Sequence, residues 1–156
     1  MSMRSAVKNQ EDPLSIRDCV ERKLNAFKKF YSATESIKNA IDAGEVDQIE
    51  GIIQERRKYM DIIDRIDDYM LKTRRDKPAH VSSLNDETRA QIQTLTDGIK
   101  KVLGDISALD KECNIAAASR LSILKQELLK VTQNRHDLQH YHASIPQAPR
   151  FLDMQL

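Results

Sequence analysis

Two histidines near the C-terminal end of the chain, His136 and His140, have the spacing that lets two imidazoles on one helix share a metal ion. Asp137 and His142 lie nearby. No glutamate stands beside the first histidine in the metalloprotease pattern, and no Cys/His set elsewhere in the sequence offers obvious further ligands. We therefore interpret the histidines as a solvated helix end that suits the helix dipole, and we expect no metal and no cofactor.

Carboxylate pairs are the second chemical candidate. Asp64 with Asp67 and Asp68, and Glu45 with Asp47, fall on polar faces of predicted helices, where carboxylates are usually just solvated. The E-x-x-H motif of di-iron bundles, a Gly-rich phosphate loop and a G-x-S-x-G motif are all missing from the sequence. The sequence therefore predicts a protein that is not an enzyme.

The two cysteines, Cys19 and Cys113, both fall among apolar positions of predicted helices. A disulfide is conceivable for an even count, but we favour reduced, buried cysteines that behave as small hydrophobic residues in a cytoplasmic protein. No stretch approaches the roughly 20 apolar residues needed to span a bilayer, and the first residues are polar. We expect a cytoplasmic protein without membrane insertion.

Charge argues for protein partners. The 25 basic and 24 acidic residues nearly balance, whereas nucleic-acid and membrane-surface binders usually carry a basic excess. The clusters Arg56-Arg57-Lys58 and Lys72 to Lys77 have no interleaved aromatic residues, and we interpret them as a solvated face and a helix C-cap. Nucleic acid is the weaker alternative.

Composition predicts long helices. Aromatic residues make up 4% of the chain, Trp is absent, and only four Gly and four Pro interrupt it. We therefore predict an all-α fold, an elongated antiparallel helical hairpin or bundle with one long C-terminal helix. A helical domain over 14–143 follows a disordered lead-in over 1–13 and precedes a flexible tail over 144–156.

The first two predicted helices, 14–43 and 46–75, form a hairpin closed by Gly44, which suits the left-handed end of a helix. Their apolar residues recur every three or four positions, which places them on one helix face, and Arg56 is the one polar interruption in the second helix. A flanking lane of Ile53, Met60 and Ile62 favours packing against more than one neighbour. The first set is Ile16, Val20, Leu24, Phe27, Tyr31, Thr34, Ile37 and Ile41; the second is Ile49, Ile52, Arg56, Tyr59, Ile63, Ile66 and Met70.

A loop of about ten residues, Lys72 to Ser83, is expected next because Pro78 rarely continues a helix. Ser83 is predicted to be the N-cap of the third helix, with Asp86 and Glu87 in the first turn of this helix. This helix is predicted over 84–142, with the seam Ile92, Leu95, Ile99, Val102, Ile106, Leu109 and Cys113 continuing through Ala117, Leu121, Leu124, Leu128, Val131, Arg135 and Leu138. A break near Asn114 that gives four shorter helices is the alternative, and a bend at Gly98 or Gly104 is a further option.

Length mismatch suggests a binding surface. The two hairpin helices are each about half as long as the third, so they are expected to cover only part of its seam. We predict that Leu121, Leu124, Leu128, Val131 and Leu138 are exposed in an isolated monomer and that a client helix or self-association covers them. In the tail, Phe151 beside Arg150 is expected to dock back on the bundle or to bind another protein.

The segment from Ile106 to Leu156 resembles flagellar export chaperones of the FlgN/FliT type. The residues that carry the resemblance are Leu109-Asp110, Asn114, the leucine-rich run LSILKQELLKV, Tyr141 and the tail sequence Pro-Arg-Phe-Leu-Asp. They cover about a third of the chain, and they fit FlgN-like and FliT-like proteins equally.

The resemblance implies a bacterial cytoplasmic chaperone that binds helical segments of hook-filament junction or filament-cap proteins and delivers them to the flagellar type III export gate. The client would lie along Leu121 to Leu138, and Tyr141 with Phe151 would contact the export gate. The alternative is a structural coiled-coil adaptor that homodimerises through its heptad seams, which explains the same apolar pattern.

Overall fold

The computed structural model describes residues 15–144, apart from the side chains of residues 80, 81 and 142–144. Within these residues the chain is helical and has no strand. Three long helices, α1 (Ile16–Ala43), α2 (Ile49–Asp76) and α4 (Asp86–Ser144), are joined by a 3-10 turn η1 (Val46–Gln48) and a short helix α3 (Pro78–Ser82). The all-α prediction is confirmed, with the long helix in the C-terminal position. The predicted lead-in over 1–13 and most of the predicted tail lie outside the described residues.

Local signals set the ends of α1. The Ser15 hydroxyl accepts a hydrogen bond from the backbone N–H of Asp18 at 3.1 Å, which satisfies one of the free donors of the first turn. At the other end, Gly44 has φ 73°, and the N–H groups of Gly44 and Glu45 donate to Ile41 and Ala40. The predicted left-handed closure at Gly44 is confirmed, because a residue without Cβ adopts this conformation at little cost.

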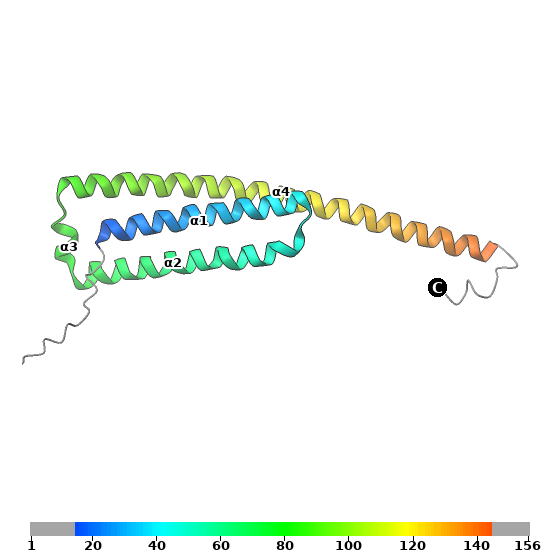
Figure 1. Ribbon diagram of the computed structural model, residues 1–156, viewed down its shortest axis with the longest axis horizontal. Coiled ribbons are helices and arrows are strands. Elements are labelled where there is room, and N and C mark those ends of the chain that lie inside the picture. The colour runs from blue at the N-terminus through cyan, green and yellow to red at the C-terminus, as the bar shows by residue number, and fades with distance from the viewer. Residues whose placement is uncertain (1–14, 145–156) are drawn as a thin grey trace, which may run out of the picture. The chain divides into compact units, whose positions relative to one another are not determined.

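The N-terminal unit ends at Asn114 and holds α1, α2 and the first part of α4. Figure 1 shows these three segments side by side, with α2 antiparallel to the other two. α1 has the most buried residues because it packs against both neighbours, whereas Ile63 is the one buried residue of α2. The core cluster joins all three helices: Val20, Leu24, Ala26, Phe27, Ile63, Ile99 and Ile106.

The connection between α2 and α4 differs from the prediction. The segment Lys72 to Ser83 is not one long loop, since α2 continues to Asp76 and α3 occupies Pro78–Ser82. Pro78 stands at the first position of α3, where its missing N–H would lack a helical partner in any case.

The predicted N-cap at Ser83 is also wrong. The Asn85 side-chain oxygen accepts a hydrogen bond from the Thr88 N–H at 2.8 Å, and Ser83 instead closes α3. Asn is as good an N-cap residue as Ser, so Asn85 caps α4 without cost in helix stability. Asp86 and Glu87 do lie in the first turn of α4.

The long helix is continuous. α4 runs without a break through Gly98, Gly104 and Asn114 to Ser144, so the alternative of four shorter helices is excluded. Its residues nevertheless belong to two compact units: those up to Asn114 are part of the N-terminal unit, and those from Ile115 are part of the second unit. Of the flanking apolar residues of α2, Ile53 is half-buried, whereas Met60 and Ile62 are exposed, so the predicted packing of these two against a further helix is not found among the described residues.

Two glycines of α4 provide a test of the packing. A Cβ at Gly104 would meet no atom within 4 Å, whereas a Cβ at Gly98 would lie 3.3 Å from Leu24 Cδ2. Gly104→Ala should raise the free energy of unfolding by about 1 kcal/mol through helix propensity. Gly98→Ala should gain less, because Leu24 must shift within a packed core. Urea unfolding followed by circular dichroism checks this, and an equal gain in both variants would contradict the packing of α4 on α1.

Candidate helix-binding surface

The apolar seam of α4 changes its environment near Asn114. Before this residue the seam is buried or half-buried, with Ile99, Ile106, Leu109 and Cys113 buried in the N-terminal unit. After it, the five predicted residues are between 50% and 66% exposed. We call these five residues the stripe: Leu121, Leu124, Leu128, Val131 and Leu138. Their predicted exposure is confirmed.

Spacing distinguishes the stripe from other exposed apolar residues of α4. Stripe residues are three, four or seven positions apart, so their side chains follow one face of the helix. Ile123 and Leu129 are also exposed, but the residues three and four positions away from each are polar or charged. The stripe is therefore a line of apolar side chains along one helix face, interrupted at Arg135, whereas Ile123 and Leu129 are isolated.

The remaining predicted contacts lie beyond the stripe. Tyr141 is exposed on α4, three residues after Leu138. Phe151, the second residue predicted to contact an export gate, lies outside the described residues. The structure therefore brings Tyr141 onto the same helix as the stripe and gives no placement for Phe151.

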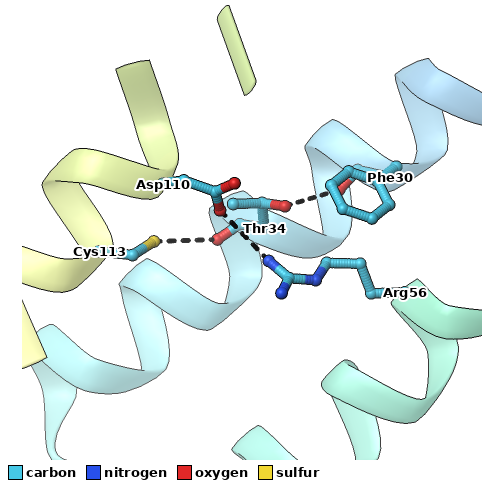
Figure 2. Close-up of polar contacts among 5 residues, drawn as sticks. All are labelled: Phe30, Thr34, Arg56, Asp110 and Cys113. Carbon is cyan, nitrogen blue, oxygen red and sulfur yellow. Dashed lines mark hydrogen bonds and ion pairs between the residues drawn. The ribbon is translucent and has the colours of Figure 1, made fainter. Parts of the chain in front are cut away.

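A polar cluster ties the three helices of the N-terminal unit together (Figure 2). Arg56 Nη1 of α2 donates to Asp110 Oδ1 of α4 at 3.3 Å, and the Arg56 guanidinium carbon lies 5.0 Å from the centre of the Phe30 ring of α1. A planar guanidinium suits both contacts at once. Arg56 was predicted to belong to a solvated basic face, and this is wrong. Its place in the apolar seam of α2 was the signal that it faces another helix.

The cysteines are unsuited to nucleophilic chemistry. Both are unpaired and buried, as predicted. Burial raises the pKa of the Cys19 and Cys113 thiols, which disfavours the reactive thiolate. The Cys113 thiol donates to the Thr34 carbonyl oxygen at 3.7 Å, and the Thr34 hydroxyl donates to the Phe30 carbonyl oxygen at 2.9 Å, as Figure 2 shows. The first of these hydrogen bonds connects α4 to α1, and the second lies within α1.

The histidine and carboxylate candidates do not converge on a site. The His136 and His140 ring centres are 5.7 Å apart and tilted. Across the described residues, no group of three or more His, Cys, Asp or Glu side chains is arranged to hold a metal ion. Among the carboxylates, Asp67 accepts from Lys23 of α1 at 2.7 Å, which is an ion pair between helices. Nor does any helix within the described residues have the length and apolar content to cross a membrane.

Arg56 and its neighbour Arg57 make a matched pair for testing the polar cluster. Arg57 is exposed and forms no ion pair within the described part of the chain. Arg56→Gln should lower the free energy of unfolding by about 1–2 kcal/mol, because it removes a cation–π contact and a partly exposed ion pair. Arg57→Gln should change it by less than about 0.5 kcal/mol. Chemical unfolding of both variants measures the difference, and equal effects would show that the cluster does not stabilise the bundle.

Comparisons with known proteins do not place the chain in a family: no protein-family model, curated protein or solved structure matches it.

Proposed function

We propose that this protein is a non-catalytic helix-binding chaperone that holds an amphipathic helix of another protein along the stripe. The observation that supports this most directly is the exposure of Leu121, Leu124, Leu128, Val131 and Leu138 on one helix face, next to a seam that is buried as far as Cys113. A helix lies naturally on such a line, because its own residues recur with the same three- and four-residue spacing.

The flagellar assignment is the specific form of this proposal and rests on the resemblance of residues 106–156 to FlgN/FliT-type chaperones. In that form the protein works in the bacterial cytoplasm, binds helical segments of hook-filament junction or filament-cap proteins and delivers them to the type III export apparatus. Tyr141 and Phe151 would contact the export gate. Exposure of Tyr141 beyond the end of the stripe is compatible with this role.

Charges around the stripe indicate the chemistry of the client. Residues 115–141 contain four Arg or Lys and two Asp or Glu. In the heptad pattern Arg120 and Lys125 flank the stripe, while Arg135 interrupts it. A client helix with acidic residues beside its apolar face would pair with these cations, and an acid opposite Arg135 would neutralise the charge inside the contact.

The adaptor alternative would pair the stripe with a second copy. A parallel, in-register pair would set Arg135 against Arg135 and bring Arg120 near Lys125, which is unfavourable for like charges. An antiparallel pair centred between Leu128 and Val131 avoids both contacts but places each Arg135 opposite Leu124, without an acid. The charges therefore favour an acidic client over a second copy.

Adjacent leucines provide the test. Leu128 and Leu129 are 66% and 68% exposed, but only Leu128 belongs to the stripe. The ligands to use are the helical terminal segments of the hook-filament junction and filament-cap proteins of the same organism, with affinity measured by fluorescence anisotropy. Leu128→Glu should weaken binding at least tenfold, because burying one leucine contributes about 1.5–3 kcal/mol and about 1.4 kcal/mol corresponds to a factor of ten.

Leu129→Glu is the control and should change the affinity by less than about threefold, since isolated surface positions carry little binding energy. Equal losses in the two variants would contradict the stripe as the contact surface. Sedimentation of the protein alone distinguishes the two alternatives. A tight dimer that the Leu128→Glu variant cannot form, in a protein that does not bind these segments, would support the adaptor instead.

A further inference from the structure

A second surface of the molecule lies between α1 and α2, within the N-terminal unit. These helices enclose an open groove of about 450 Å³, whose apolar side chains include Ala26 of α1 and Ile62 and Ile66 of α2. Ile62 is 43% exposed although it lies between two helices. This residue is one of the two exposed residues of the flanking apolar lane of α2. The groove is thus an apolar surface separate from the stripe.

Three cations line the same groove: Arg22 and Lys29 from α1 and Arg65 from α2. None of the three forms an ion pair within the described part of the chain. By contrast, cations at other helix contacts of this unit are paired, with Lys23 on Asp67, Lys38 on Glu112 and Arg56 on Asp110. Positive charge is therefore left unneutralised around the apolar groove.

We propose that this groove binds an acidic peptide segment of a partner protein, with a large apolar side chain packed between Ala26, Ile62 and Ile66 and carboxylates paired with Arg22, Lys29 and Arg65. Arg22 and Lys29 are seven residues apart on one face of α1, a separation of about 10 Å along the helix axis. Two glutamates seven residues, or about two turns, apart on a helical peptide have the same separation. One lipid headgroup, by contrast, reaches only one of these cations.

Charge complementarity is the reason for choosing a peptide with carboxylates. Bidentate pairing with arginine gives a carboxylate both energy and orientation, and an apolar floor supplies the burial that a charged surface alone lacks. The groove uses residues of the N-terminal unit only, so its occupancy is independent of the client proposed for the stripe.

The test uses the full-length protein and a fluorescein-labelled helical peptide that carries glutamates seven residues apart with leucines between them. Fluorescence anisotropy should show saturable binding. Lys29→Glu and Arg65→Glu should each weaken it at least fivefold, because a close ion pair becomes a repulsive contact. Ile62→Gln should weaken it as well, through loss of the apolar contact.

The control variants change the net charge of the protein by the same amount as the test variants Lys29→Glu and Arg65→Glu. Lys28 neighbours Lys29 and Arg57 lies on α2, yet neither lines the groove. Lys28→Glu and Arg57→Glu should leave the affinity within about twofold. Leu128→Glu should also leave it unchanged, which separates this proposal from the function of the stripe.

Three results would overturn the proposal. The first is equal loss of binding in the control variants, which would show non-specific charge attraction. The second is undiminished binding of a peptide with both glutamates replaced by glutamine. The third is binding of anionic phospholipid vesicles, but not of the peptide, which would make the groove a membrane-facing surface.

Discussion

The structure depends on one constraint, that each apolar face of a long helix needs another helix to cover it. α1 and α2 have 28 residues each, whereas α4 has 59. The hairpin covers the seam of α4 as far as Cys113, and the stripe residues of the second unit are half or more exposed. Covering about five half-exposed apolar side chains would contribute several kcal/mol, enough to support a specific but reversible contact after the cost of association.

The N-terminal unit is organised around α1. Core residues of α1 pack against both α2 and α4. Arg56 of α2 also contacts Asp110 of α4 and the Phe30 ring of α1, so one side chain links all three helices. A partly exposed ion pair adds little to the free energy of unfolding. We therefore expect its main effect to be on the register of α2 against α4, because a shifted helix would leave Arg56 against apolar side chains. The Cys113–Thr34 contact connects α4 and α1 near the end of the covered seam.

Much of this fold follows from local pattern in the sequence. The three-four spacing predicts the long helices, and Gly44 predicts the closure of α1, because each depends on residues close together in the chain. Exposure of the stripe follows from comparing helix lengths. The sequence prediction of Ser83 as the cap of α4 was wrong, because Ser and Asn have similar N-cap preferences and the start of α4 at Asp86 depends on where α3 ends. The Arg56–Asp110 pair and the cationic groove depend on which faces of separate helices meet, and only the three-dimensional register determines this.

Amide hydrogen exchange along α4 tests the central claim most directly, in the free protein at low micromolar concentration. Amides over 92–113 should exchange slowly, at a rate set by unfolding of the N-terminal unit, because their side chains are packed. Amides over 121–138 should exchange orders of magnitude faster, since a helix without tertiary contacts is only marginally stable in water. Equal protection of the two segments at every dilution would show that the stripe is already covered by the chain itself, which would contradict a surface that awaits a partner helix.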